Sequence, residues 1–442
     1  MRPNPPKPVR RAARVSRWAF LRAFRRDLLS AQPERLFAAK MAEYRTPFFR
    51  SFLINEPSLI ELVLRERPRD FPKSDRVGEG LRPLLANSVF LTNGDAWSRQ
   101  RRIIDPAFSG GRLRQTYPAM QAAALDMAAR LRPGPQNVEP VMSHVAADVI
   151  FRTLFSRAIG PDLAGTVFAA LHAYQRRQPI VNAAAFLPLP RWMPRGYGRR
   201  ARTAAAAIRS EIGAICRARA AEIAAGTAAE DLATKIMTTT DPETGDTFDP
   251  EEMIDQVAIF FLAGHETTAS AMGWALYLLS IDPGAQRIAA EEAQENPAFS
   301  EISEMTFIRD VVREALRLYP PVPMMVRSAA RSETFRGRHV RRGSPIVISP
   351  WHLHRNPRHW PDPDAFDPAR FRKTPEAVRQ AYLPFSAGPR ICPGAGFAMT
   401  EMALVLSTIL ARWRILPGPE PVPVAHLTLR ARDGIQLSLE PR

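Results

Sequence analysis

Cysteine is scarce in this chain, which has two, Cys216 and Cys392, among 442 residues. A secreted disulfide framework in so long a chain needs many more, so the sequence excludes one. A lone cysteine can still be a metal ligand, a nucleophile or a buried apolar residue. Cys216 lies in the alanine- and arginine-rich helical pattern Arg202–Ala225, and we interpret it as a packing residue.

Two motifs are also missing. There is no glycine-rich phosphate loop, so we expect the chain to bind neither flavin nor a nicotinamide cofactor itself. No run of about 18 apolar residues occurs, which predicts that no helix spans a membrane. Nor does the N-terminus match a secretory signal, because basic residues interrupt any apolar run.

Negative charge is in short supply: 44 acidic residues face 61 basic ones, for a net charge of +17. Nucleic-acid binding would explain the sign, but the arginines are scattered and no basic helix interleaved with aromatic residues occurs. A surface that docks an acidic protein or touches anionic lipid explains it equally well.

The basic residues are dense in an N-terminal segment, residues 1–44, which we separate from a single domain over residues 45–442. Residues 1–14 are rich in proline and arginine and are predicted to be extended or disordered. Residues 15–29 form an amphipathic pattern at helical period, and two interpretations stay open. The segment either lies on an anionic membrane surface or packs on the domain with its charges solvated.

The central part of the chain predicts one very long helix. Asp249 and Pro250 are a strong start, and the apolar pattern runs to Ile281, about 32 residues or roughly 48 Å. A helix that is apolar nearly all round is buried. In its middle the sequence AGHETT, Ala263–Thr268, combines small residues with polar ones. Buried polarity indicates a functional site, although a hydroxyl bonded back to the preceding turn is the simpler alternative.

A second unusual stretch is PFSAGPRICPGAG, Pro384–Gly396. Its glycines and prolines predict a stiff, tightly turning loop that carries Cys392. An apolar helical pattern, Phe397–Trp413, follows, and the N-terminus of a helix favours a nearby anion such as a thiolate.

This loop resembles the haem-binding signature of the cytochrome P450 family at Phe385, Gly388, Arg390, Cys392 and Gly394. The resemblance implies that Cys392 is the axial thiolate ligand of a haem b iron. It also implies that Phe385 screens the sulfur, that Arg390 reaches a haem propionate and that Gly394 belongs to the cofactor site.

Other motifs are similar to the same family. Ala263–Thr268 resembles its oxygen-activation motif, with Ala263 beside the haem and Glu266 and Thr267 as the acid–alcohol pair that supplies protons. His265 is expected to be structural. Trp97 and Arg101, four apart on one helix face, and Arg327 are expected to bind haem propionates.

A second group of residues is implied to support the haem loop and to line the substrate pocket. Glu314 and Arg317 match the family's Glu-x-x-Arg pair, and Arg370 would complete a buried cluster that fixes the loop. The residues expected to line the pocket are apolar: Phe90, Phe260, Phe261, Ala263, Val322, Met324 and Met325.

The resemblance therefore implies a mainly α-helical cytochrome P450 fold with a small β-rich lobe and haem between the long helix and the Cys392 helix. The activity would be monooxygenation, in the cytoplasm, of a hydrophobic fatty acid, terpenoid or carotenoid. Electrons would come from a ferredoxin or flavodoxin-type donor with an NAD(P)H-dependent reductase, docking near Cys392 on the positive charge of Arg99, Arg101, Arg102 and Arg390. Two alternatives stay open: a haem-thiolate enzyme that uses peroxide or rearranges its substrate, and a non-catalytic haem protein.

Overall fold

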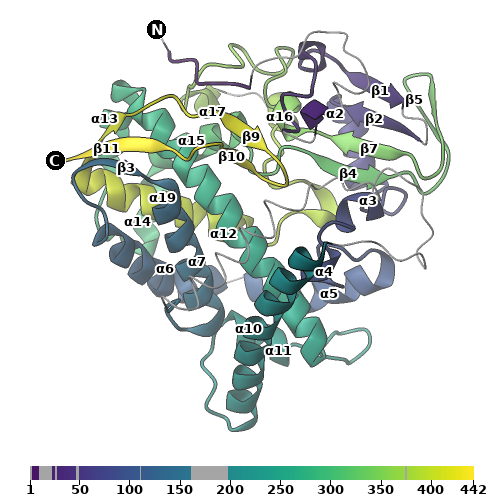
Figure 1. The fold of residues 1–442 in the computed structure, drawn as a ribbon, viewed down its shortest axis with the longest axis horizontal. Coiled ribbons are helices and arrows are strands. Elements are labelled where there is room, and N and C mark those ends of the chain that lie inside the picture. The colour runs from purple at the N-terminus through teal and green to yellow at the C-terminus, as the bar shows by residue number, and fades with distance from the viewer. Residues whose placement is uncertain are drawn as a thin grey trace. The chain divides into compact units, whose positions relative to one another are not determined.

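The computed structural model describes residues 2–8, 22–24, 27–45, 49–109, 111–160, 198–373 and 376–442 (Figure 1). Its contacts divide the chain into two compact units. Unit 1 comprises Met1–Phe71, Ala124–Val145 and Glu266–Arg442, and unit 2 comprises Pro72–Ala123 and Ala146–His265. Three helices have residues in both: α6 (Arg112–Ala128), α7 (Glu139–Phe155) and α12 (Pro250–Ser280).

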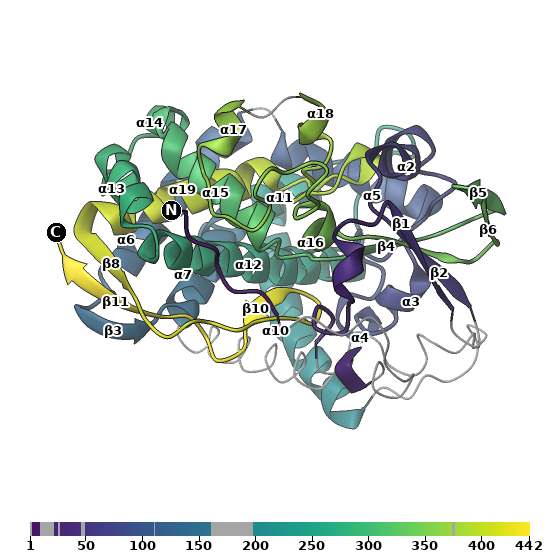
Figure 2. The ribbon, with the colours of Figure 1, turned by 90° about the horizontal axis from the view of Figure 1, so that it is seen from above.

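The largest sheet of unit 1 has four strands in the order β1-β2-β7-β4 (Figure 1), and Figure 2 shows β1, β2 and β4 from above. The β2–β7 pair is parallel and the others are antiparallel. Phe52 and Ile54 of β2 lie opposite Ile346 and Ile348 of β7, and all four are fully buried. Apolar residues two apart point to one face of a strand, so this pairing forms one side of the core. The bounds are β1 (Met41–Arg45), β2 (Arg50–Ile54), β4 (Met325–Ser328) and β7 (Pro345–Ile348).

Three smaller sheets contain the other described strands of unit 1. One has the order β3-β11-β8, and two are antiparallel hairpins, β5–β6 and β9–β10. Arg336 and Gly337 turn the first hairpin with φ of 49° and 72°, the conformation of a tight two-residue turn. The bounds are β3 (Gly134–Asn137), β5 (Glu333–Phe335), β6 (Arg338–Val340), β8 (Trp413–Pro417), β9 (Pro423–Ala425), β10 (Leu429–Ala431) and β11 (Gln436–Pro441).

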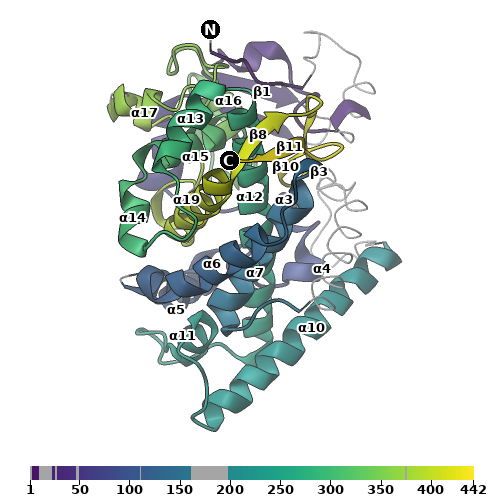
Figure 3. The same ribbon diagram turned by 90° about the vertical axis from the view of Figure 1, so that its left-hand side faces the viewer.

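Helices α13, α14 and α15 of unit 1 pack against α19, as Figure 3 shows. The middle of α19 is buried on every side. The long elements are α13 (Pro283–Glu292), α14 (Phe299–Glu304), α15 (Thr306–Leu318) and α19 (Ala395–Arg412). The short ones are η1 (Glu34–Leu36), α2 (Pro57–Glu61), η2 (Leu62–Glu66), α16 (Pro350–Leu353), α17 (Arg370–Lys373), α18 (Glu376–Arg379) and η3 (Gly388–Arg390).

The regular elements among the described residues of unit 2 are helices, joined by loops. The segment 73–91 contains two single helical turns, one that ends at Gly78 and one that has Pro83 in its first turn. Cys216 is buried on the longest helix, and burial raises the pKa of its thiol to about 12, as suits a packing residue. The bounds are α3 (Asp75–Gly78), α4 (Arg82–Leu85), α5 (Gly94–Phe108), α10 (Arg199–Ala224) and α11 (Leu232–Thr238).

The predicted long helix is confirmed as α12, the long teal helix of Figure 1. Asp249 Oδ1 accepts from Glu252 N at 2.7 Å, and Glu252 Oε2 accepts from Asp249 N at 3.1 Å. This reciprocal capping satisfies two free amides at the helix start. At the other end α12 stops at Ser280. Asp282 is the N-cap of the next helix, α13, because its Oδ1 accepts a hydrogen bond from Ala285 N at 2.9 Å.

The first residues of the chain lie against unit 1. Phe366 N donates to Pro3 O at 3.1 Å, Tyr319 Oη donates to Pro6 O at 2.7 Å, and Arg2 pairs with Asp367 at 2.6 Å. Residues 2–8 are thus extended, one of the two forms predicted. Most of the amphipathic segment 15–29, with its proposed membrane contact, lies outside the described residues, as does the proline-rich stretch 186–194.

The predicted mainly helical architecture with small sheets is confirmed. Within the described ranges one helix, α19, is long and apolar enough to cross a membrane. The sequence analysis had predicted none. Two thirds of that helix is buried inside the protein, and a core helix has the same composition as a membrane span, so α19 is weak evidence for one.

Candidate functional site

The Cys392 loop is held by its own backbone hydrogen bonds and by close contact with η2. Cys392 N donates to Phe385 O at 3.0 Å, and Ile391 N donates to Gly388 O at 3.0 Å. Gly388 has φ of 69°, and a Cβ placed on it would lie 2.0 Å from the carbonyl oxygen of Leu64 in η2. Only glycine allows this contact, which confirms the tight loop. Cys392 itself is exposed, and Gly394 follows it as the N-cap of α19.

Arg327 supplies a buried positive charge in the same unit. It is 7% exposed, and its Nε has no hydrogen-bond partner among the described residues. Burial, with a smaller effect of the charge of Arg390, lowers the pKa of Arg327 to about 10. Burial also lowers the pKa of Arg390, whose Nη1 donates to Pro68 O at 2.7 Å. A buried cation beside another cation calls for an anion, so Arg327 fits the expected propionate.

Glu314, Arg317 and Arg370 form the predicted cluster. Both Arg317 Nε and Nη2 donate to the Glu314 carboxylate, at 2.7 and 2.8 Å, and Arg370 Nε donates to it at 2.9 Å. Glu314 and Arg317 are fully buried. The remaining donors of the two arginines bind backbone carbonyls of the segment 354–365, so the cluster holds that segment against α15.

His354 connects this cluster to Leu383, just before the Cys392 loop. Its Nε2 accepts from Leu383 N at 2.8 Å, and its Nδ1 faces Arg317 O at 3.3 Å. Because Nε2 accepts, the proton belongs on Nδ1. Burial lowers the pKa of His354 to about 3, so the ring stays neutral. The sequence favours a hydrogen-bonding role for His354, because no acidic or cysteine partner accompanies it to form a metal site, and these contacts confirm that role.

One stripe of α12 is left accessible. Nearly every residue of its middle is buried, but Ala263 is exposed and Phe260, Gly264 and Thr267 are half-buried. These positions follow the spacing i, i+3, i+4 and i+7, so they share one face. Ala263 is the exposed small residue of this stripe, whereas a Cβ on Gly264 would lie 2.6 Å from Ile150 Cδ1, so packing against α7 also requires a small residue there. The approach of a large ligand at Ala263 stays a prediction.

Glu266 does not belong to this accessible stripe of α12. Its Oε1 accepts from the Thr428 hydroxyl and from Arg430 Nη2, both in the C-terminal part of unit 1. Thr268 Oγ1 lies 3.3 Å from Oε1 of the buried Glu401 on α19. These partners lie more than 130 residues away in sequence, so the sequence analysis found none of Thr428, Arg430 and Glu401.

The other predicted propionate ligands lie in unit 2. The guanidinium of Arg101 lies 5.9 Å from the ring centre of Trp97, which confirms that the two share a face of α5. Arg101 Nε also lies 2.7 Å from Asp105 Oδ1. Lys73 Nζ lies 5.8 Å from the same ring, so Trp97 is next to two cations.

The predicted pocket residues differ in exposure. Phe90 is 42% exposed, and Phe260 packs edge-on to Phe108 at 5.6 Å. Phe261 is buried, 5.4 Å from the ring of His265 and 5.6 Å from that of Phe151. This stacking agrees with a structural role for His265. In unit 1 the predicted pocket residues Val322, Met324 and Met325 are half-buried.

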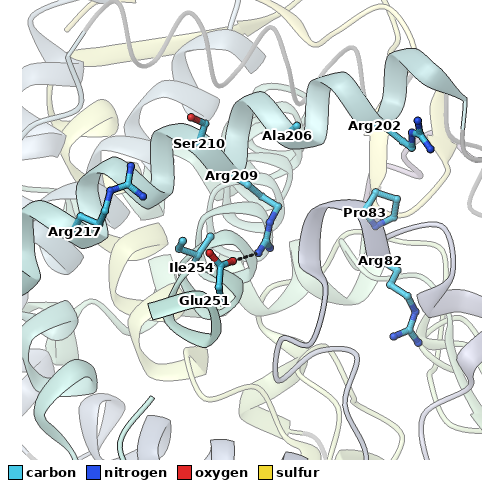
Figure 4. A pocket seen from close by; sticks show the side chains of 9 residues that line it. All are labelled: Arg82, Pro83, Arg202, Ala206, Arg209, Ser210, Arg217, Glu251 and Ile254. Atoms are coloured by element: carbon cyan, nitrogen blue, oxygen red, sulfur yellow. Dashed lines mark hydrogen bonds and ion pairs between the residues drawn. The ribbon is translucent and has the colours of Figure 1, made fainter. Parts of the chain in front are cut away.

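A pocket of about 610 Å³ in unit 2 is rich in arginine (Figure 4). Arg202, Arg209 and Arg217 line it from α10 and Arg82 from α4. Acidic residues balance two of them, since Arg209 bonds Asp255 at 2.6 Å and Arg82 lies 3.7 Å from Glu79. Arg202 and Arg217 are exposed. The pocket therefore lacks a buried cation like Arg327.

Three of the four arginines expected to dock an electron donor are engaged within unit 2. Arg99 binds Glu252 at 2.7 Å, Arg102 binds Asp241, and Arg101 pairs with Asp105. Acidic neighbours reduce the positive charge that these side chains offer a partner. In the part of the chain that the structure describes, no group of three or more histidine, cysteine or acidic side chains forms a metal site.

Comparison with known proteins gives the family. The profile described as Cytochrome P450 matches residues 41–438. Cyclooctat-9-en-7-ol 5-monooxygenase of Streptomyces melanosporofaciens is 34% identical over 86% of this chain and 83% of its own. Cyclooctatin synthase of the same organism is 31% identical over 88% of this chain and 86% of its own. A putative cytochrome P450 132 of Mycobacterium tuberculosis is 28% identical over 91% and 90%. This chain therefore belongs to the cytochrome P450 family of haem-thiolate monooxygenases, as its cysteine loop and long-helix motif predict.

Proposed function

We propose that this monooxygenase uses haem b bound through Cys392 to insert one oxygen atom of O₂ into a hydrophobic terpenoid. The balance is R–H + O₂ + 2e⁻ + 2H⁺ → R–OH + H₂O. The observation that carries the proposal is that unit 1 combines an exposed Cys392 on a glycine-dependent loop with a buried Arg327 that lies within electrostatic range of Arg390 in the same loop.

The cofactor would be held by charge and by shape. The haem supplies the centre at which O₂ is reduced and from which one oxygen atom passes to the substrate. Cys392 would provide the thiolate, screened by Phe385, with Gly394 leaving room beside the sulfur. Arg327 and Arg390 would neutralise one or both propionates. In unit 2 the proposed propionate ligands are Trp97, through its indole N–H, and Arg101, through its charge. Ala263 would let the ring approach α12.

Thr267 and Glu266 would supply the two protons. A hydroxyl on the accessible stripe can hold a proton at one position and keep others away. Glu266 would restore that proton from solvent. A proton delivered elsewhere would release reduced oxygen without product, so the placement of Thr267 decides how many electrons end in product.

The terpenoid class is favoured among the hydrophobic substrates because of the relatives. The name of the 34% identical enzyme gives a cyclic alcohol, cyclooctat-9-en-7-ol, as its substrate. Val322, Met324 and Met325 offer apolar surface without a charged group, and methionine adapts to irregular shapes. We expect a ring-containing, uncharged molecule.

The electrons would come from a separate ferredoxin or flavodoxin-type protein with its NAD(P)H-dependent reductase, in the cytoplasm. Arg390, the expected docking residue in the Cys392 loop, lies beside the exposed Ile391. An acidic partner is consistent with the net charge of +17.

Three experiments test the proposal. The pyridine haemochrome spectrum should identify non-covalent haem b. Ring-containing terpenoid alcohols should shift the Soret band at lower concentration than fatty acids of similar carbon number. Product should form with O₂ and a surrogate electron donor. Product with peroxide alone would favour the peroxide-using alternative, and a haem spectrum without product in either assay would favour the non-catalytic one.

A further inference from the structure

The arginine-lined pocket of unit 2 takes no part in the site that the family motifs describe. Arg82 lines it from α4, and Arg202, Arg209 and Arg217 line it from α10 (Figure 4). None of its lining residues is among those predicted to bind haem or substrate. Its volume of about 610 Å³ is typical of small-molecule sites. We call it the arginine pocket.

Arg209 lies between two carboxylates that differ in exposure. Its Nη1 donates to Asp255 Oδ1 at 2.6 Å and to Leu84 O at 3.2 Å, and its Nη2 donates to Glu251 Oε2 at 3.2 Å. The Asp255 side chain is 5% exposed and that of Glu251 is 79% exposed. An ion pair to so exposed a side chain contributes little to stability. An incoming anion can therefore replace Glu251 on Nη2 while Asp255 continues to hold the guanidinium in place.

Arg202 and Arg217 lie on either side of Arg209 along α10. They are seven and eight residues away from it, about 10 and 12 Å along the helix axis, and all three charges can attract one anion. Both are exposed, and the ion pairs described for the arginines of this pocket involve only Arg82 and Arg209. An anion at Arg209 would therefore meet two further positive charges with which no described carboxylate pairs.

Gly213 gives the Arg217 side chain its room. A Cβ placed on Gly213 would lie 3.1 Å from Arg217 Nη1 and 3.2 Å from Ile254 Cδ1. Glycine inside a helix is less stable than alanine, and here its lack of a side chain lets the Arg217 guanidinium lie along α10 near the apolar Ile254. Pro83 and Ala206 add to the apolar lining. The arginine pocket thus offers hydrocarbon surface as well as charge.

Arg82 adds a donor from α4. Its Nε is buried and has no hydrogen-bond partner among the described residues, because Glu79 Oε1 is 3.7 Å away. Four arginines thus face three carboxylates, those of Glu79, Glu251 and Asp255, and Glu251 is replaceable. A buried donor without a partner is unfavourable, so an acceptor oxygen brought by a ligand fits this pocket.

We propose that the arginine pocket binds an organic anion with a carboxylate or phosphate head group on an apolar body. The planar guanidinium matches the oxygens of both head groups. The head group would take the place of Glu251 on Arg209, and the apolar body would lie against Pro83, Ala206 and Ile254. Binding changes no bond and transfers no electron, so this site goes beyond the proposed monooxygenation and is independent of it.

Isothermal titration calorimetry of the full-length holoprotein tests the site with octyl phosphate, octanoate, octanol and inorganic phosphate. Octyl phosphate, octanoate or both should bind, and the double variant Arg202→Gln/Arg217→Gln should bind them about tenfold more weakly, because two positive charges are lost. Glu251→Gln should bind them more tightly, because it removes the competing carboxylate. Arg199, an exposed arginine of α10 outside the pocket, is the matched control. Arg199→Gln should change the dissociation constant less than about twofold.

The comparison of probes identifies the head group: tighter binding of octyl phosphate assigns a phosphate, and tighter binding of octanoate a carboxylate. Equal affinity for octanol would contradict a site for anions, and equal affinity for inorganic phosphate would contradict a site for an apolar body. Probes bound only beside the haem would shift the Soret band and bind both variants like wild type, which overturns the proposal, as does no binding at all. Because no readout requires turnover, such a failure leaves the proposed monooxygenation in place.

Discussion

Thr268 on α12 and Glu401 on α19 are joined through their side chains, Oγ1 to Oε1, at 3.3 Å. The two residues lie 133 positions apart, and both are buried. Thr268 directly follows the proposed catalytic Thr267, and Glu401 lies on the helix that begins after Cys392. The two candidate motifs are therefore connected within unit 1 by one polar contact between buried helices.

Glu401 should make the protein less stable as the pH rises. Burial raises the pKa of Glu401 from 4.5 to about 8, and the bond with Thr268 opposes this only in part. Below pH 4.5 both the folded and the unfolded chain hold the proton. Between 4.5 and about 8 the unfolded chain loses it while the folded one keeps it, so this group lowers the unfolding free energy by about 1.4 kcal/mol per pH unit.

Urea unfolding between pH 5 and 8 measures the effect. Glu401→Gln should remove this part of the slope, whereas Glu304→Gln, an exposed glutamate of α14, should not. Equal slopes for Glu401→Gln and wild type would show that Glu401 is ionised in the folded protein.

The Cys392 loop depends on Gly388 for space as well as for conformation. Gly388→Ala would place Cβ 2.0 Å from Leu64 O, so the loop has to move. Gly343 has a similar φ of 79° with nothing near its Cβ, so Gly343→Ala experiences only the conformational cost, about 1–2 kcal/mol. We expect Gly388→Ala to lose haem and stability well beyond that control. Equal losses in haem content and unfolding free energy would contradict the tight contact.

The buried cluster of Glu314, Arg317 and Arg370 should contribute far more to the free energy of unfolding than a surface ion pair. Arg370→Ala leaves Glu314 with one of its two arginines, and removing one partner of a buried pair costs about 3–5 kcal/mol. Arg287→Ala breaks the exposed Arg287–Glu291 pair of α13 and should cost less than about 1 kcal/mol. Chemical unfolding of both variants measures the two losses of unfolding free energy. If the loss for Arg370→Ala were as small as that for Arg287→Ala, Arg370 would not support the buried cluster.

Substitutions of the neighbouring Thr267 and Thr268 should differ in effect. The first should reduce the product formed per electron, and the second should not. Thr267→Ala should consume NAD(P)H at a similar rate but yield roughly tenfold less product, because proton placement contributes at least that much. Thr268→Val should keep its coupling, since Thr268 is buried and bonded to Glu401. Product and peroxide are measured per electron consumed. Full coupling in Thr267→Ala would remove Thr267 from the mechanism.

Local sequence signals predicted the elements that depend on local chemistry. Asp249 and Pro250 determine the start of α12, and glycine spacing revealed the tight Cys392 loop. Long-range pairs left no such signal. Nothing near Glu266 indicates that Arg430 binds it, and nothing near Arg102 indicates that Asp241 reduces its charge. Such partners depend on how distant segments fold together, which a single sequence does not display.

The most direct test of the account is the spectrum of the reduced, carbon-monoxide-treated protein. A thiolate from Cys392 predicts the Soret maximum that gives the family its name, and Cys392→Ser should abolish it. Cys216→Ala should leave it in place, because Cys216 is buried on α10 in the other unit. If the maximum is absent from the wild-type protein, or persists in Cys392→Ser, Cys392 does not bind the iron.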